Sequence, residues 1–297
     1  VIDNLSSGRV SNLNKSKKKI KLIISDLSKD GLWKKYFKNV DIVYHIAGLG
    51  DIVPSVKDPR KYFLANVNAT LNVIEACREY NVNKIVYTAS SSCYGLAKKI
   101  PTSENDKIDI QHPYALTKYL GEQILLFWSK IYKIKVISLR LFNIYGLRSR
   151  TTGAYGAVFG TFLRQKMSTK PLTVVGDGKQ KRDFLHVDDL VRLFIKCSKI
   201  RKTGVYNVGK SEPVSINKIV NIFKSRKINI PKRPGEPKIT YANINKIKKA
   251  TNWRPKIDIV KGTKELLDNI EMWKYAPLWT PKKIKKANKY WFKYLGK

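Results

Sequence analysis

Short apolar runs alternate with longer amphipathic segments through the first half of the chain. The apolar runs have the length of buried strands, and they cover residues 1–3, 20–25, 41–45, 84–89 and 135–140. Helical spacing of apolar residues falls between them, over 31–38, 59–80 and 113–132. Strands that alternate with crossover helices predict an α/β fold, a doubly wound parallel sheet covered on both faces. Ligands of such a sheet bind beyond the carboxyl ends of its strands.

The pattern loosens after Gly146. A loop rich in Gly, Thr and Tyr leads into a predicted helix. Predicted strands at 172–175 and 205–209 and predicted helices at 186–200 and 215–225 follow. This mixture predicts a smaller α/β substrate-binding lobe, some of whose segments return to the main sheet. We therefore expect a main domain over 1–146, a lobe over 147–272 and an extension over 273–297.

The extension is basic and amphipathic. Ile284, Trp291 and Leu295 recur at helical spacing after Pro281, which places one apolar stripe on a lysine-rich helix. Such a helix can lie on an anionic membrane or fold back on its own domain. Because the polar face is short, we expect an ordered extension that folds back and that the chemistry does not need.

Composition adds a formal net charge of +37. A chain of this kind attracts polyanions, but its lysines are spread along nearly every surface-type segment and no nucleic-acid-binding motif accompanies them. We expect a solvated basic surface and no specific nucleic-acid partner. No apolar run reaches membrane-spanning length. The three cysteines lack metal-ligand spacing, which predicts free buried thiols, no metal and a cytoplasmic location.

Candidate chemistry begins with Tyr114 and Lys118. Their spacing of four places both side chains on one helix face, one turn apart. A free tyrosine, with a pKa of about 10, is a poor base at neutral pH. A neighbouring ammonium lowers that pKa, so we expect Tyr114 to act as a proton acceptor. Alone, the same spacing is common on solvated helices.

Two further motifs flank this pair. Ser90-Ser91-Ser92 ends the preceding strand, and Arg140-Leu141-Phe142-Asn143-Ile144-Tyr145-Gly146 follows the next one. In this order the motifs resemble those of the extended short-chain dehydrogenases, the NAD-dependent epimerase/dehydratase family, and in particular its UDP-glucose and UDP-N-acetylglucosamine 4-epimerases. The resemblance implies a Rossmann-like fold, NAD as cofactor and a nucleoside-diphosphate sugar, with UDP favoured, as substrate.

The resemblance assigns cofactor contacts to nine positions. They are Asp3, Asn4, Asp26, Leu27, Ala47, Gly48, Asn66, Tyr114 and Lys118. Asp3 would accept hydrogen bonds from the adenosine ribose and repel a 2′-phosphate, which selects NAD over NADP. The family's Gly-rich turn is not in this sequence, so we expect one strand and one helix to precede Val1.

Substrate contacts are assigned in the same way to eight positions. They are Ser91, Asn143, the nucleobase positions Ala157 and Val158, Arg182, Arg233, Glu236 and Thr240. Arg182 and Arg233 would pair with the diphosphate, because a planar guanidinium binds two oxygens at once; structural ion pairs are the alternative. Glu236 stands where the family usually has Asp, and the small Thr240 leaves room for an acetamido group.

By resemblance, Tyr114 takes the proton of the sugar C4 hydroxyl while NAD takes the hydride, Ser90 hydrogen-bonds the hydroxyl and Lys118 holds the nicotinamide ribose. Family dehydratases carry an acidic residue beside the catalytic serine, where this chain has Ser91 and Ser92. We therefore favour C4 epimerisation through a 4-keto sugar. A 2-epimerase, a keto-sugar reductase and a dehydratase remain alternatives. A degenerate, polyanion-binding scaffold is the non-enzymatic one, although such a scaffold has no need of the serine–tyrosine–lysine set.

The resemblance also implies a homodimer formed through paired helices, one of which carries Tyr114. Its apolar positions Ile124, Leu125, Trp128 and Ile131 would lie in that contact or in the adjacent core.

Overall fold

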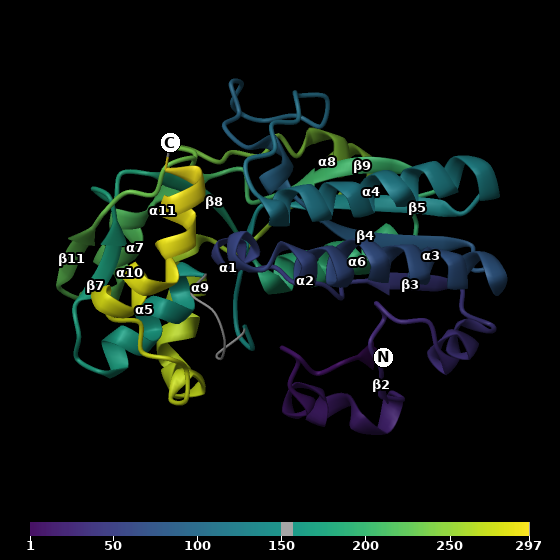
Figure 1. The fold of residues 1–297 in the computed structure, drawn as a ribbon, viewed down its shortest axis with the longest axis horizontal. Helices are drawn as coiled ribbons and strands as arrows, with labels where there is room; N and C mark the ends of the chain where they lie inside the picture. Colours follow the sequence, from purple (N-terminus) through teal and green to yellow (C-terminus); the bar gives the residue numbers. More distant parts are fainter. Residues whose placement is uncertain (150–156, 297) are drawn as a thin grey trace.

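A four-stranded parallel sheet forms the centre of the larger lobe (Figure 1). We describe the protein from a computed structural model covering residues 1–149 and 157–296. The strand order is β3-β4-β5-β9. The bounds are Ile42–His45 for β3, Lys84–Ser90 for β4, Lys135–Leu141 for β5 and Gly204–Val208 for β9. The parallel α/β prediction is confirmed, and β9 shows that a late segment returns to this sheet.

Side chains alternate between two apolar cores, one on each face of the sheet. Ile85 and Val136 point into one core, while their neighbours Val86 and Ile137 belong to the other. The first core lies under α3 (Ala69–Glu79) and α4 (Pro113–Tyr132), the second under α6 (Val187–Cys197) and α8 (Asn245–Thr251). Three shorter segments, α1 (Ile52–Lys57), α2 (Pro59–Phe63) and the π-helical turn Leu64–Asn68, lead into α3.

The predicted helix over 113–132 is found with those bounds. Of its four residues assigned to a dimer contact or the core, Leu125 is fully buried and Ile124 and Trp128 pack against the same core. Ile131 is half exposed, at 51%. The homodimer stays a prediction.

The N-terminal segment forms a separate two-stranded parallel sheet. β1 (Ile2–Asp3) pairs with β2 (Ile23–Ile24). The 3₁₀ segment Val10–Lys19 connects the two strands, and a second one, Leu32–Phe37, follows β2. The first 3₁₀ segment was not predicted, because its lysine-rich sequence buries no residue and so leaves no apolar signal.

The smaller lobe is built from short strands and helices around Phe162, Phe223 and Leu266. Its two sheets have the orders β10-β8-β6 and β11-β7. The strands are β6 (Asn143–Tyr145), β7 (Leu172–Val175), β8 (Lys181–His186), β10 (Pro213–Ser215) and β11 (Lys227–Ile230); the helices are α5 (Val158–Met167), α7 (Ile216–Phe223) and α9 (Ile259–Asp268). Of these strands and helices, β7, α5 and α7 were predicted as such, whereas the other strands are short and partly polar.

The C-terminal extension folds back as predicted. A 3₁₀ turn, Ile270–Trp273, is followed by α10 (Pro281–Ala287) and α11 (Lys289–Leu295), which lie against the smaller lobe (Figure 1). Trp273 is fully buried in that lobe's core, so the lobe extends beyond the boundary predicted at residue 272. Within residues 1–149 and 157–296, no helix has the length and apolarity needed to cross a membrane.

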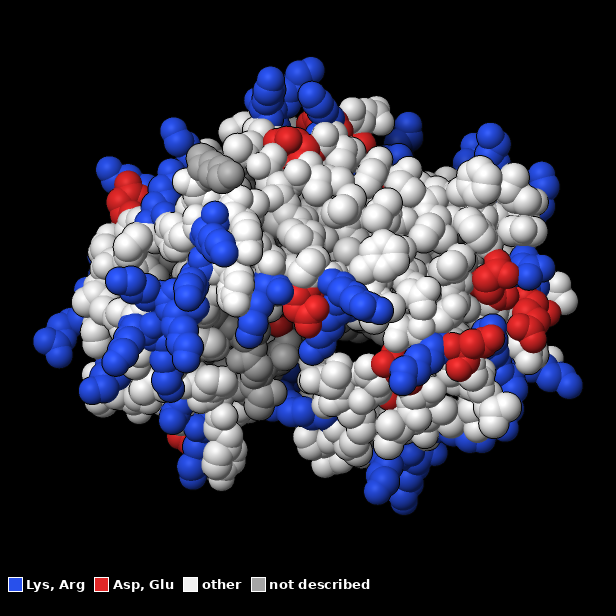
Figure 2. Space-filling view, viewed as in Figure 1, with Lys and Arg blue, Asp and Glu red and all other residues white. Residues whose placement is uncertain are grey.

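The charged surface agrees with a solvated distribution of lysines. Figure 2 shows lysine and arginine side chains scattered over the visible face of both lobes, with acidic residues interspersed. All three cysteines, Cys77, Cys93 and Cys197, are buried and free, as predicted.

Candidate active site

The predicted catalytic pair, Tyr114 and Lys118, lies on the first turns of α4. Pro113 occupies the first helical position, and His112 caps the helix by accepting a hydrogen bond from the Ala115 N–H at its Nδ1 (3.2 Å). Burial lowers the pKa of His112 to about 4, which keeps Nδ1 free of a proton and able to accept. The cap therefore fixes the turn that carries Tyr114 and, one turn later, Lys118.

Tyr114 meets the carboxyl end of β4. Ser90 is the last residue of that strand, only 7% exposed, and its side chain hydrogen-bonds Tyr114. Burial raises the pKa of Tyr114, while the Ser90 hydrogen bond acts in the opposite direction. The net shift is upward and Lys118 is not among the groups that contribute to it, so the expectation of a lowered tyrosine pKa is wrong for this structure.

Lys118 is 6% exposed and faces the loop after β3. Its Nζ lies 4.3 Å from the centroid of the Tyr87 ring, and a Cβ on Gly48 would be 3.8 Å from the same atom. Burial lowers the pKa of Lys118 to about 7, although the charge of Glu122, one turn further along α4, raises it. A buried ammonium beside a backbone loop is suited to hold hydroxyl groups of a ligand.

This burial gives a testable effect on stability. We expect Lys118→Met to stabilise the protein without added nucleotide, because it removes a charge whose folded-state pKa is about 7 against an ordinary value of 10.5. The unfolded chain binds more protons between these values, so the destabilisation by Lys118 is complete below about pH 7 and fades as the pH rises. Urea unfolding should show a gain of roughly 4 kcal/mol near neutral pH and of about 1 kcal/mol near pH 9.5. An equal gain at both pH values would contradict this origin.

The loop that faces Lys118 is held by Asn66. The Asn66 Nδ2 donates to the Leu49 carbonyl (3.1 Å) and its Oδ1 accepts from the Leu49 N–H (2.8 Å). Gly48 has a φ of +153°, and a Cβ there would lie 2.7 Å from the Asn66 Oδ1. A side chain at position 48 would clash with Asn66 and would keep a ligand from approaching the loop backbone. Asn66 thus positions the Ala47–Gly48 loop, and it does so from a π-helical turn, a feature frequent at functional sites.

The remaining predicted cofactor residues meet at the carboxyl ends of β1 and β2. The Asp3 Oδ1 accepts from the Leu5 N–H at 2.6 Å, and the Asp26 Oδ1 accepts from the Ser28 N–H at 2.9 Å. The hydrogen bond from the Ser28 N–H lowers the pKa of Asp26. A hydrogen bond from the Asn4 side chain lowers it further, by a smaller amount. Leu27 packs against the core under α3. Carboxylates at these strand ends, with the open backbone at Gly48, fit a dinucleotide better than a metal ion.

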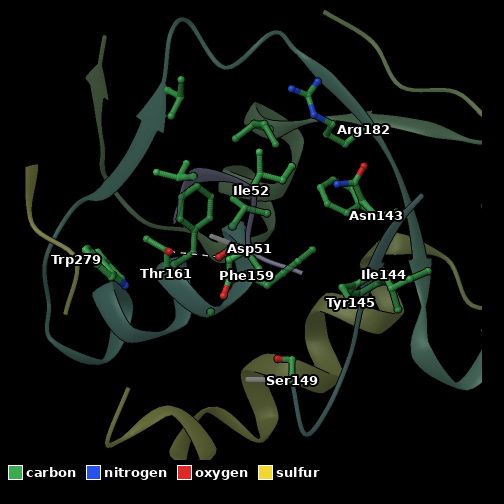
Figure 3. Close-up of a pocket in the computed structure, with 18 of the residues that line it drawn as sticks. Asp51, Ile52, Asn143, Ile144, Tyr145, Ser149, Phe159, Thr161, Arg182 and Trp279 are labelled. Atoms are coloured by element: carbon green, nitrogen blue, oxygen red, sulfur yellow. Dashed lines mark hydrogen bonds between the residues drawn. The ribbon is translucent and has the colours of Figure 1, made fainter. Parts of the chain in front are cut away.

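A pocket of about 380 Å³ lies between the lobes and includes Asp51, whose charge acts on Tyr114. Its wall includes six of the eight predicted substrate residues: Asn143, Ala157, Val158, Arg182, Arg233 and Glu236. Asp51 directly precedes α1 and Ile52 is its first residue. Figure 3 shows both near the middle of the view, with Arg182 and Asn143 on one side and Trp279 on the other. The volume falls within the range of small-molecule sites.

Two arginines converge on this pocket. Arg182, on β8, donates to the Pro237 carbonyl (2.8 Å), and Arg233 pairs with Glu236 (2.6 Å). Burial lowers the pKa of Arg182; the Glu236 charge opposes this and the Arg233 charge adds to it. Arg233 thus makes an ion pair in this structure, and its diphosphate role stays a prediction. An anion placed at both guanidinium groups would relieve their repulsion.

Two predicted substrate residues are not in the pocket wall as far as residues 1–149 and 157–296 form it. Ser91 begins the 3₁₀ turn Ser91–Tyr94 after β4. The Thr240 hydroxyl accepts from the Asp183 N–H (3.2 Å) and bonds to the Asn143 Oδ1 (3.3 Å), so it links three segments of the lobe. Their substrate roles stay predictions.

Asp51 links the pocket wall to Tyr114, and the sequence analysis did not assign it to the site. It lines the pocket, its charge raises the pKa of Tyr114, and its carbonyl accepts from the Tyr62 hydroxyl at 2.5 Å. The Tyr62 ring in turn contacts the Tyr114 ring edge-on at 6.4 Å. The only signal in the sequence was its place in the loop after β3, at the ligand-binding edge of the sheet.

The C-terminal segment also contributes wall residues that the sequence did not reveal. Trp273, Ala276, Pro277 and Trp279 line the pocket. Their apolar pattern was assigned to the extension, and nothing local indicates that it folds over the ligand site.

The fold and the site define a two-lobed, dinucleotide-dependent enzyme with a serine–tyrosine–lysine set at the edge of a parallel sheet. A model of the NAD dependent epimerase/dehydratase family matches residues 1–209, and the chain belongs to this family. NAD is accordingly its cofactor, and the Rossmann-like fold expected from the sequence is confirmed.

Similar proteins extend over nearly the whole chain. A UDP-glucuronate 4-epimerase of Thermodesulfobacterium geofontis is 30% identical, over 91% of this chain and 89% of that protein. A solved UDP-N-acetylglucosamine 4-epimerase from Methanobrevibacter ruminantium, in complex with UDP-N-acetylmuramic acid, is 30% identical with a TM-score of 0.84, covering 92% of this chain and 89% of that one. A UDP-glucuronic acid 4-epimerase from Bacillus cereus, in complex with UDP-glucuronic acid and NAD, is 29% identical with a TM-score of 0.83, covering 91% and 90%.

Proposed function

We propose that the protein inverts C4 of a sugar carried by a nucleoside diphosphate. The observation that carries the proposal is the Ser90–Tyr114–Lys118 set, which adjoins a pocket with two arginines. Both similar structures described above are UDP-sugar 4-epimerases, which supports UDP as the nucleotide. The serines at positions 91 and 92 supply no carboxylic acid for dehydration.

Tyr114 is the acid–base residue in this proposal. Its hydroxyl oxygen takes the proton of the C4 hydroxyl as the C–O bond becomes a carbonyl, and later returns a proton to the C4 oxygen. Ser90 hydrogen-bonds the same oxygen and stabilises the charge that develops on it. Because burial raises the pKa of Tyr114, the Ser90 hydrogen bond, which lowers it, is the contact that favours proton transfer to the tyrosine.

The cofactor residues serve to hold NAD against the sugar. Bound NAD supplies the hydride acceptor and donor for C4, and it is regenerated in each cycle. Asp3 and Asp26 bind at the adenosine end, the Ala47–Gly48 loop approaches the middle, and Lys118 bonds the ribose beside the nicotinamide. Arg182 and Arg233 hold the substrate diphosphate, and the C4 inversion requires the sugar to turn while these contacts persist.

Turnover in deuterated water separates this reaction from the alternatives. Incubated with UDP-glucose, UDP-N-acetylglucosamine or UDP-glucuronate and NAD, the protein should convert at least one sugar to its C4 epimer without added reductant. A hydride that leaves and returns to C4 brings no solvent deuterium to a carbon atom, whereas C2 inversion by deprotonation or dehydration does. A stable 4-keto-6-deoxy product, or deuterium at C2 or C5, would overturn the proposal.

A further inference from the structure

The two C-terminal helices, α10 and α11, touch both lobes. Ile284 and Trp291 are buried, at 2% exposure each, in a cluster with Val53 of α1. Ile230 at the end of β11 packs against the same cluster. Since α1 belongs to the larger lobe and β11 to the smaller one, this helix pair forms a strap between the two lobes (Figure 1). Val53, against which the strap packs, lines the pocket.

Trp291 joins this strap to the loop that carries the diphosphate arginine. Its indole Nε1 donates a hydrogen bond to the Pro234 carbonyl at 3.0 Å. Pro234 directly follows Arg233, and the Arg233–Glu236 ion pair closes the same turn. We call residues 231–237 the arginine loop. A buried indole N–H without a partner is costly, so this bond fixes the loop relative to α11.

The same indole reaches the catalytic helix on its other side. The rings of Trp291 and His112 lie 5.7 Å apart at 48°. His112 caps α4 through its Nδ1 and stacks on Tyr114 with a centroid distance of 6.0 Å and an angle of 9°. Trp291, His112 and Tyr114 therefore form a continuous line of contacts from the arginine loop to the acid–base residue.

We propose that Trp291 is a positioning residue, through which the C-terminal strap sets the arginine loop against the catalytic helix. The strap is then part of the nucleotide-sugar site, contrary to the expectation that the extension is not needed for the chemistry. The inference rests on the proposed function for what the loop binds, but the contacts themselves do not depend on it.

Two substitutions separate the two contacts of the indole. Trp291→Phe keeps an aromatic ring beside His112 and loses only the hydrogen bond to Pro234. Trp291→Ala loses both. Tyr294→Phe is the matched control, because Tyr294 lies on the same helix, is 53% exposed and keeps its ring.

Hydrogen–deuterium exchange of the protein without added nucleotide is the decisive measurement, because it needs no turnover. Trp291→Phe should speed exchange in the arginine loop alone. Trp291→Ala should also speed exchange of the first α4 amides, Ala115 and Leu116, which bond to His112. The control should match the wild type.

Kinetics then test the consequence for the site. A lost neutral hydrogen bond corresponds to about fivefold in affinity, so Trp291→Phe should raise KM for the nucleotide sugar by about that factor with kcat unchanged. Trp291→Ala should lower kcat as well. Unchanged exchange of the arginine loop in Trp291→Phe would overturn the proposal, whether or not the wild-type protein turns over a nucleotide sugar. If the loop exchange rises as expected but the wild-type protein shows no turnover, the result counts against the proposed function instead. If Trp291→Ala does not fold, Trp291→Leu in the full-length chain, which keeps an apolar side chain in the cluster, provides the second arm.

Discussion

Tyr114→Phe is expected to reduce kcat by about 10²- to 10⁴-fold, the range for loss of a positioned acid–base group. The substitution removes one hydroxyl and keeps the ring that stacks on His112 and meets Tyr62. Nucleotide-sugar affinity should stay near the wild-type value, because the proposed diphosphate residues, Arg182 and Arg233, lie in the pocket wall and are unchanged. Single-turnover kinetics and calorimetric titration with UDP measure the two quantities separately.

Tyr119→Phe supplies the matched control. Tyr119 lies on the same helix, and its side chain packs against the core that contains Val86 and Ile137. Losing its hydroxyl should leave kcat unchanged. Equal turnover by Tyr114→Phe and wild type would show that another group carries the proton.

Glu122→Gln is expected to destabilise the protein by about 3–5 kcal/mol, the usual cost of breaking a buried ion pair from one side. The Glu122 carboxylate receives hydrogen bonds from Arg140 (2.6 Å from Nη2) and from the Ser138 hydroxyl (2.8 Å). Glu122 is 1% and Arg140 5% exposed. An amide leaves the guanidinium uncompensated in the interior. Urea unfolding at neutral pH measures the loss as a lower midpoint.

Two companions make this prediction specific. Asp30→Asn breaks an exposed pair with Lys34 and should shift the midpoint little, because solvent screens that pair. The double substitution Glu122→Leu with Arg140→Met should recover most of the loss, since it leaves no unpaired charge. A loss below about 1 kcal/mol for the single substitution would show that water reaches the pair.

The Glu122 pair also bears on catalysis. Glu122 lies one turn beyond Lys118 on α4, and its charge raises the lysine pKa, which burial holds near 7. Glu122→Gln should therefore lower that pKa further and reduce the fraction of charged Lys118 at neutral pH. The buried ion pair thus anchors α4 to β5, and its Glu122 charge favours the charged form of Lys118.

The sequence alone determined the parts of the protein that depend on local pattern and topology. The apolar runs located β3, β4 and β5, and the helical spacing located α4 with its observed bounds. Parallel strands bring their carboxyl ends to one edge, so the order of strands and helices was enough to place Ser90 and the α4 residues in one site. The motif order then identified the family.

Tertiary structure decided what depends on contacts between distant segments. The sign of the Tyr114 pKa shift follows from burial, which residue spacing does not specify. The short strands β6, β8, β10 and β11 carry too few apolar residues to be seen without their partners. Asp51 and Trp279 enter the pocket wall, and Trp291 meets Pro234 and His112, only because chain segments far apart in sequence pack together. Such packing is set by the shapes of whole surfaces, and no local pattern along the chain encodes it.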